Sequence, residues 1–177
     1  MSAVVLGDRA RVAVEYELVP DVGPRERKWL FGRLALWVGG LAVGRHDEVG
    51  ALTVALTSFP AVLANQGKRG RPHLMQAPAE EVFQRMYEEM YVDSGQSDAA
   101  VRRARQEYGP LLVLPPGFDL FDGWTAMLIE DETTGRFLVQ GPDEQVHEAK
   151  IPAGELDRVI DAFLTDLERI SGQIRAV

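Results

Sequence analysis

Hydrophobic and polar residues alternate along the first part of the chain. Residues 11–19 (RVAVEYELV) alternate with a period of two, which predicts a half-buried strand. Residues 29–38 (WLFGRLALWV) predict a second strand, and residues 20–27 between them are rich in turn formers and predict a loop. The pair Gly39–Gly40 suits the positive φ angles of a tight hairpin, so a third strand is expected over residues 41–45. In the second strand, one face would carry Leu30, Gly32, Leu34, Leu36 and Val38, and the other Trp29, Phe31, Arg33, Ala35 and Trp37.

The glycine-rich stretch in this region fits neither a membrane segment nor a phosphate loop. The apolar run over residues 34–43 is half the length of about 20 residues that a spanning helix needs. Gly39, Gly40 and Gly44 do not match the glycine spacing of a phosphate loop, and no Lys-Ser or Lys-Thr follows them. Gly32, in the middle of a predicted strand, indicates a bulge or a close neighbour.

The middle of the chain changes to helical periodicity. Residues 52–63 repeat apolar side chains at helical spacing, and Pro60 is expected to kink or split that helix. A further helix is predicted to begin at Pro78, and residues 93–109 are expected to form a loop with at most one short helix. The loop after the first helix carries three basic side chains that we expect to be solvated: Lys68, Arg69 and Arg71.

A second group of strands and a long helix complete the pattern. Residues 155–172 carry the strongest helical periodicity, with Gly172 as the expected end. The predicted fold is α+β in one domain over residues 1–177, with about six antiparallel strands in two meanders packed against helices and a long amphipathic C-terminal helix. The strands of the second meander are expected over residues 124–130, 136–140 and 146–151. The side chains expected in the core include Trp29, Trp37, Trp124, Phe163 and Leu167.

Composition narrows the chemistry available to the protein. The chain has 177 residues, of which 46% are hydrophobic and 26% charged, and these values are ordinary for a globular domain. The absence of cysteine excludes disulfides and thiolate sites. The first residues lack the pattern of a signal peptide, and the expected location is the cytoplasm.

Charge is divided unevenly along the chain. Residues 1–109 hold 14 basic and 14 acidic side chains, whereas residues 110–177 hold 5 basic and 13 acidic ones, which gives the whole net charge of −8. A negative surface repels phosphate, so neither nucleic acid nor an anionic membrane is expected as a partner. Such a surface attracts a basic protein, although acidic surfaces also simply keep proteins soluble.

Two groups of polar residues are candidates for a catalytic or metal site. His46 lies beside Asp47 and Glu48, but neighbouring strand residues point to opposite faces, so surface positions are expected rather than a metal site. Glu15 and Glu17 share one face of the first strand, which is more typical of a wet face than of an acid–base pair. The sequence has neither a G-x-S-x-G nor an H-E-x-x-H motif. We therefore expect no catalytic residue, metal or cofactor.

Several segments, in this order, resemble the immunity protein 42 family, which comprises predicted immunity proteins of bacterial polymorphic toxin systems. They are VAVEYEL, WLFGRLALWVGG, PAEEVFQRMY, FDGWTAMLIEDETTGRFLV and IPAGELDRVIDAF, and the resemblance covers about residues 7–170. The motif residues are hydrophobic or turn-forming, so they indicate a fold rather than a site. The most specific are Trp29, Phe31, Gly32, Trp37, Gly39, Gly40, Asp122, Gly123 and Trp124.

The resemblance implies that the protein is not an enzyme and that it binds and blocks a cognate toxin domain, which protects the producing cell. Many polymorphic toxin domains act on nucleic acids and are basic, so a basic toxin, such as a nuclease, would suit an acidic inhibitor. The candidate toxin-binding residues are Glu130, Asp131, Glu132, Asp143, Glu144 and Glu148. Two alternatives remain: a small-ligand-binding or enzymatic α+β domain, and a structural module whose strand edges pair into a homodimer. A toxin gene immediately upstream would distinguish them.

Overall fold

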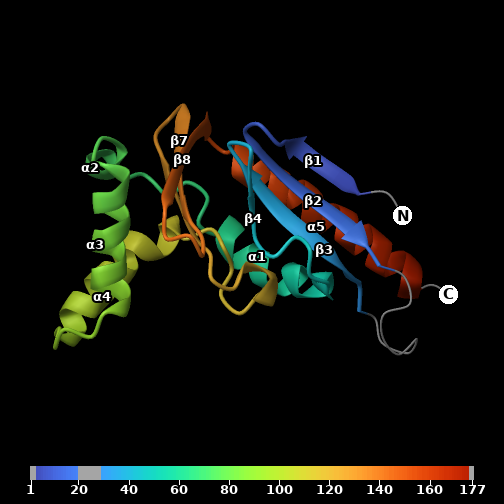
Figure 1. Cartoon of the computed structure of the whole chain (residues 1–177), viewed down its shortest axis with the longest axis horizontal. Coiled ribbons are helices and arrows are strands. Elements are labelled where there is room, and N and C mark those ends of the chain that lie inside the picture. The colour runs from blue at the N-terminus through green and yellow to red at the C-terminus, as the bar shows by residue number, and fades with distance from the viewer. Residues whose placement is uncertain (1–2, 20–28, 176–177) are drawn as a thin grey trace.

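The computed structural model describes residues 3–19 and 29–175, so the loop predicted for residues 20–27 lies outside the described residues. Figure 1 shows three parts side by side along the longest axis of the molecule. A sheet of five strands with a long helix lies at one end, a sheet of three strands lies in the middle, and three helices lie at the other end. The predicted α+β class, with antiparallel strands and a long C-terminal helix, is confirmed.

The first sheet, sheet A, contains the predicted N-terminal meander and two further strands. Its strands are β1 (Val4–Asp8), β2 (Val12–Leu18), β3 (Phe31–Val38), β4 (Leu41–Val43) and β5 (Gly50–Ala51). They are antiparallel in the order β1-β2-β3-β4, and β5 also pairs with β3. Gly39 and Gly40 join β3 to β4 with φ angles of 58° and 85°, which confirms the predicted hairpin. No alternation predicted β1, because it lies at the sheet edge and is exposed on both faces.

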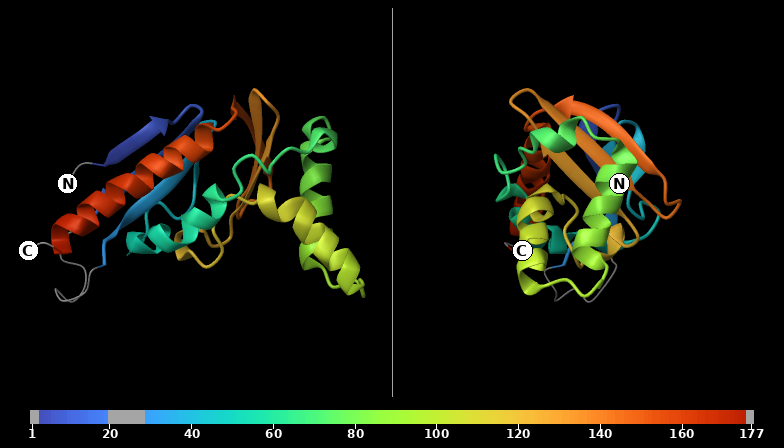
Figure 2. Two further views of the ribbon diagram at one scale, coloured as in Figure 1. Left: turned by 180° about the vertical axis from the view of Figure 1, so that it is seen from behind. Right: turned by 90° about the vertical axis from the view of Figure 1, so that its left-hand side faces the viewer.

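The two faces of β3 separate as its alternation predicts. Leu34, Leu36 and Val38 are buried beneath α5 (Glu155–Arg175), which covers one face of sheet A (Figures 1 and 2). The prediction that the first two tryptophans are buried is wrong for Trp29, which is 48% exposed, and Trp37 is only partly buried. Both belong to the opposite face of the sheet, where charged side chains also lie.

Gly32 confirms the close neighbour expected at its position. A Cβ atom at this residue would lie 2.2 Å from the backbone oxygen of Glu17 and 2.7 Å from a methyl group of Leu52. Only glycine fits between β2 and the segment that follows β5.

The helices differ from the prediction in three places. The helix α1 (Ala55–Leu63), preceded by a 3-10 turn (Leu52–Val54), runs through Pro60 and is not split there. The region expected to be mainly loop contains α4 (Asp98–Tyr108), capped by the hydroxyl of Ser97; only Ala104 and Tyr108 of this helix are buried, and most of its other residues are polar or alanine. The helix α5 continues past Gly172, which lacks the positive φ of a helix end.

Two more helices, α2 (Pro72–Met75) and α3 (Ala79–Tyr91), precede α4. None of the helices described is long and apolar enough to cross a membrane.

The second sheet, sheet B, is buried on both faces along its first two strands, whereas most residues of its third strand are exposed or partly exposed. Its strands are β6 (Thr125–Glu130), β7 (Thr134–Gln140) and β8 (Val146–Pro152), in that order and antiparallel. Leu128 and Phe137 face the main core, which sheet B shares with sheet A, α1 and α5. Met127 and Leu138 face a second core, formed with α2, α3 and α4. Sheet B is therefore the middle layer of the molecule (Figure 2).

Candidate functional site: an acidic cleft at the β6–β7 turn

Three of the six residues predicted to bind the toxin line one cleft. A cleft of about 690 Å³ lies where residues 66–76 meet the β6–β7 turn and the beginning of α5. One guanidinium, that of Arg69, lies against it. Its lining contains four carboxylates, those of Glu130, Asp131, Glu132 and Asp157. The cleft is therefore acidic.

Arg69 is fully buried, so the prediction that it is solvated is wrong. Its two terminal nitrogens each donate a hydrogen bond of 2.8 Å to the carboxylate of Asp157. One of them also donates to Glu130 at 3.1 Å, and the other to the backbone oxygen of Val62 at 3.0 Å. A guanidinium is a planar fork that fits a carboxylate bidentately, which makes arginine the usual residue for such a buried ion pair. Arg69 thus joins the end of α1, the end of β6 and the start of α5.

The charges around Arg69 keep it ionised. Burial by itself lowers the pKa of the Arg69 guanidinium, but the hydrogen bonds and negative charges of Asp157 and Glu130 outweigh that effect and raise the pKa above its ordinary value. No feature of the sequence distinguished Arg69 from the neighbouring Lys68 and Arg71, because its burial depends on segments about 60 and 90 residues away.

Glu130 belongs to the same network and is not a solvated turn position. Its side chain is only 11% exposed. One carboxylate oxygen accepts from Arg69, the other accepts from the backbone N–H of Gly154 at 2.8 Å, and the backbone N–H of Glu130 donates to the backbone oxygen of Arg69. Glu130 therefore connects the end of β6 to Arg69 and to Gly154, just before α5.

Asp131 and Glu132 are the exposed carboxylates of the cleft. Asp131 accepts hydrogen bonds from the backbone N–H groups of Thr133 and Thr134 at 2.8 and 2.7 Å. These bonds lower the pKa of the Asp131 carboxyl below its ordinary value, because they stabilise the ionised form. Within the described part of the chain, the carboxylate of Glu132 forms no hydrogen bond or ion pair, so its charge faces solvent.

The other three candidate residues lie away from the cleft. Asp143 and Glu144 occupy the β7–β8 turn, at the opposite end of sheet B, roughly 17 Å along β6 from the β6–β7 turn. Asp143 lies 3.4 Å from His147. Glu148 lies in β8, and the guanidinium of Arg136 donates to it at 2.9 and 3.1 Å. The six candidate residues therefore lie in at least two separate places on sheet B.

The paired carboxylates of β2 lie on the polar face of sheet A. Glu15 forms an ion pair of 2.7 Å with Arg9 and accepts a hydrogen bond of 2.7 Å from the indole N–H of Trp37. Glu17 pairs with Arg33 at 3.0 Å. Both carboxylates are only partly exposed, so this face is half-buried rather than fully solvated as predicted. In residues 3–19 and 29–175, no group of three or more histidine or carboxylate side chains is placed to hold a metal ion.

The residues of the FDGW motif form a turn before β6. Gly123 has a φ of 82°, as this turn requires, and Trp124 is partly buried. The carboxylate of Asp122 is exposed and forms no hydrogen bond or ion pair among the described residues. The turn leaves an unpaired negative charge next to an aromatic ring.

Comparisons with known proteins identify the family and support the fold described above. The family model described as immunity protein 42 matches residues 1–166. The fold is similar to the crystal structure of CdiI from Burkholderia dolosa AUO158, with a TM-score of 0.74 and 16% sequence identity; the match covers 92% of this chain and 99% of that one. No curated protein matches the chain. The chain therefore belongs to the immunity protein 42 family, the family of toxin-neutralising proteins that its sequence motifs resemble.

Proposed function

We propose that this immunity protein blocks its cognate toxin domain by stoichiometric binding, with acidic surfaces of its C-terminal half facing a basic surface of the toxin. The observation that carries this proposal is the division of charge: residues 110–177 account for the whole net charge of −8. Complementary charge accelerates the encounter of two proteins and excludes partners of like charge.

The exposed carboxylates at the two ends of sheet B are the best candidates for this attraction. Asp131 and Glu132 line the acidic cleft, and Asp143 and Glu144 lie in the β7–β8 turn. Two of the six candidates are less suited to the role, because Glu130 is already bound to Arg69 and Glu148 to Arg136.

A basic toxin would include any nuclease whose cleft binds phosphate groups through lysine and arginine side chains. An acidic protein bound over such a cleft would exclude the nucleic acid by charge and by volume. Inhibition of this kind needs no catalysis by the immunity protein, and its membership of an inhibitor family supports a non-enzymatic role.

A homodimer is the second candidate arrangement. The edge strand β1 exposes Val4 by 37% and Val5 by 39%, and an exposed edge strand can pair with another copy. Light scattering of the purified protein would give the mass of a dimer if this pairing occurs.

The toxin-binding proposal is tested by association kinetics with the toxin domain encoded next to this chain's gene. Two double reversals, Asp131→Lys with Glu132→Lys and Asp143→Lys with Glu144→Lys, should each slow association several-fold at low salt, because they reverse local charge on the binding side. The difference should shrink at high salt, since screening shortens the reach of exposed charges to about 3 Å at 1 M.

The matched control is Asp47→Lys with Glu48→Lys, which changes net charge equally at an exposed turn in the charge-balanced half of the chain. If both test variants associate as fast as the wild type at low salt, the acidic-surface proposal is wrong. Equal slowing by the control would mean that net charge, rather than these two surfaces, attracts the toxin.

A further inference from the structure

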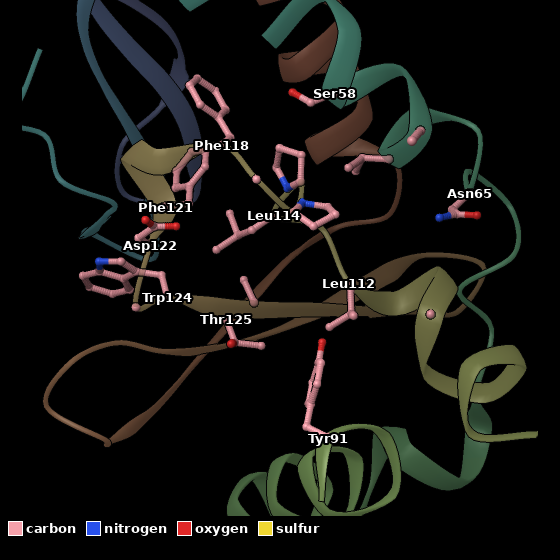
Figure 3. Close-up of a pocket in the computed structure, with 18 residues that line it drawn as sticks. Ser58, Asn65, Tyr91, Leu112, Leu114, Phe118, Phe121, Asp122, Trp124 and Thr125 are labelled. Atoms are coloured by element: carbon pink, nitrogen blue, oxygen red, sulfur yellow. The ribbon is translucent and has the colours of Figure 1, made fainter. Parts of the chain in front are cut away.

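A second hollow, here called the aromatic groove, lies at the other end of β6 from the acidic cleft. Its volume is about 400 Å³, and it is bounded by the end of α1, the connector over residues 112–118 and the start of β6 (Figure 3). Its lining is mostly apolar and aromatic. Among the residues that line it, the one charged side chain is that of Asp122.

Two aromatic side chains on different elements form walls of the groove. Trp124 is partly buried, and the backbone of Gly141 packs so closely on its indole that a Cβ atom there would lie 2.7 Å from the ring. The ring of Trp124 is therefore held in place. Tyr91, in the last turn of α3, is 56% exposed and directs its hydroxyl toward Leu112 (Figure 3).

The charge of the groove is negative and unpaired. The carboxylate of Asp122 lies beside the indole of Trp124 (Figure 3). Asp119, three residues earlier in the sequence, is also exposed, but it does not line the groove. An apolar lining with a carboxylate at its rim complements a side chain that has a long aliphatic stem and a positive head.

The aromatic groove and the acidic cleft are neighbours along the chain. Asn65 lines the groove, whereas Gln66 and Gly67 line the cleft. The strand β6 also runs from one to the other, with Thr125 in the groove and Glu130 in the cleft. The groove therefore lies next to the cleft at residues 65 and 66, near the surface to which we assign the attraction of the toxin.

We propose that the aromatic groove is the anchor site of the toxin interface and that it takes an arginine side chain of the toxin. This inference rests on the proposed function. The arginine stem lies on the apolar lining, its guanidinium stacks on an aromatic ring, and the carboxylate of Asp122 pairs with it. Exposed rim charges act mainly on the association rate, while buried aromatic anchors act on the dissociation rate, so the two sites have separable effects.

The test compares Tyr91→Ala with Trp29→Ala as a control. Trp29 is a comparably exposed aromatic residue, at 48%, and it does not line the groove; Tyr87 is unsuitable because its ring packs on that of Tyr91 with the centroids 5.7 Å apart. With the toxin domain encoded next to this chain's gene as the probe, Tyr91→Ala should raise the dissociation rate roughly tenfold or more, and Trp29→Ala less than about twofold. Asp122→Asn should also raise the dissociation rate, and it should change the association rate little at high salt.

A double-mutant cycle identifies the occupant. Each arginine of the toxin surface is replaced by alanine and combined with Asp122→Asn, and one arginine should show a coupling of about tenfold in affinity. If no arginine couples, or if Tyr91→Ala dissociates as slowly as the wild type, the inference is wrong while the proposed function stands. If the wild type does not bind the toxin domain at all, both are wrong.

Discussion

Arg69 holds three distant segments together through a charge that has no access to water. Removing such a charge from water costs several kcal/mol, and its ion pairs offset that cost only when the geometry is good. Here the pairing with Asp157 is bidentate, and Glu130 and Val62 supply further acceptors. Because Nε of Arg69 has no hydrogen-bond partner, loss of Asp157 would leave the buried guanidinium with Glu130 as its remaining charged partner.

At the residue scale we predict that Asp157→Asn destabilises the protein by about 3–5 kcal/mol, because it leaves the buried guanidinium of Arg69 short of negative charge. Urea denaturation measures this change. The control is Asp161→Asn, an exposed aspartate one turn further along α5, which should alter stability by less than about 0.5 kcal/mol. Equal, small effects of the two substitutions would contradict the role assigned to the Arg69 network.

At the scale of elements, the strands of sheet A and the helix α5 pack as their periodicities predict. Val12, Val14 and Tyr16 of β2 face α5, and Phe163 and Leu167 of α5 are fully buried, as expected. The ring centroids of Tyr16 and Phe163 are 5.4 Å apart. At the rim of this contact, the hydroxyl of Tyr16 donates a hydrogen bond to the carboxylate of Asp166, which also pairs with Arg169.

This contact between β2 and α5 should make stability depend on acid pH. The hydrogen bond from Tyr16, together with Arg169, lowers the pKa of the Asp166 carboxyl below its ordinary value, and burial followed by that hydrogen bond raises the pKa of Tyr16. Because the folded-state pKa of Asp166 lies below its unfolded value, its ionised form stabilises the fold above about pH 4. That contribution is lost as the pH falls through the folded-state pKa.

We therefore predict that Asp166→Asn is less stable than the wild type at pH 6 and that the difference shrinks as the pH falls from about 4 toward 2. Urea denaturation at a series of pH values measures it. The variant Tyr16→Phe keeps the ring and removes the hydrogen-bond donor. The difference in stability between this variant and the wild type should shrink over the same pH range. A difference that stays constant down to pH 2 would refute this linkage.

At the scale of the whole molecule, sheet A and sheet B share one core. The aromatic rings of Phe59, Phe118, Phe121 and Phe163 pack on one another, with centroid distances of 5.5–6.3 Å along the chain of contacts. They come from α1, the segment before β6, and α5. The main core therefore joins these three segments to both sheets. The second core shares sheet B with α3 and α4.

Because sheet B contributes to both cores, we predict that the chain is a single domain and unfolds as one cooperative unit. Urea transitions followed by tryptophan fluorescence and by far-UV circular dichroism should coincide. The tryptophans report on both sheets, and the far-UV signal reports mainly on the helices. An earlier loss of helical signal would show instead that α3 and α4 unfold separately.

The sequence by itself determined the features that depend on local periodicity. Alternation assigned the buried and polar faces of β2 and β3, the pair Gly39–Gly40 specified the hairpin of β3 and β4, and the spacing of apolar residues specified α5. It did not indicate β1, because an edge strand exposed on both faces does not alternate, and it allowed only a short helix where α4 lies, because that segment is mostly polar residues and alanine.

The tertiary structure alone decided how the charges are used. It buried Arg69 against Asp157 and Glu130, and it placed Asp131 and Asp143, which lie twelve residues apart in the sequence, at opposite ends of sheet B. It also brought together the walls of the aromatic groove from α1, α3, the connector and β6. The physical reason is that burial and charge pairing depend on which distant segments meet, and no local pattern of residues encodes that meeting.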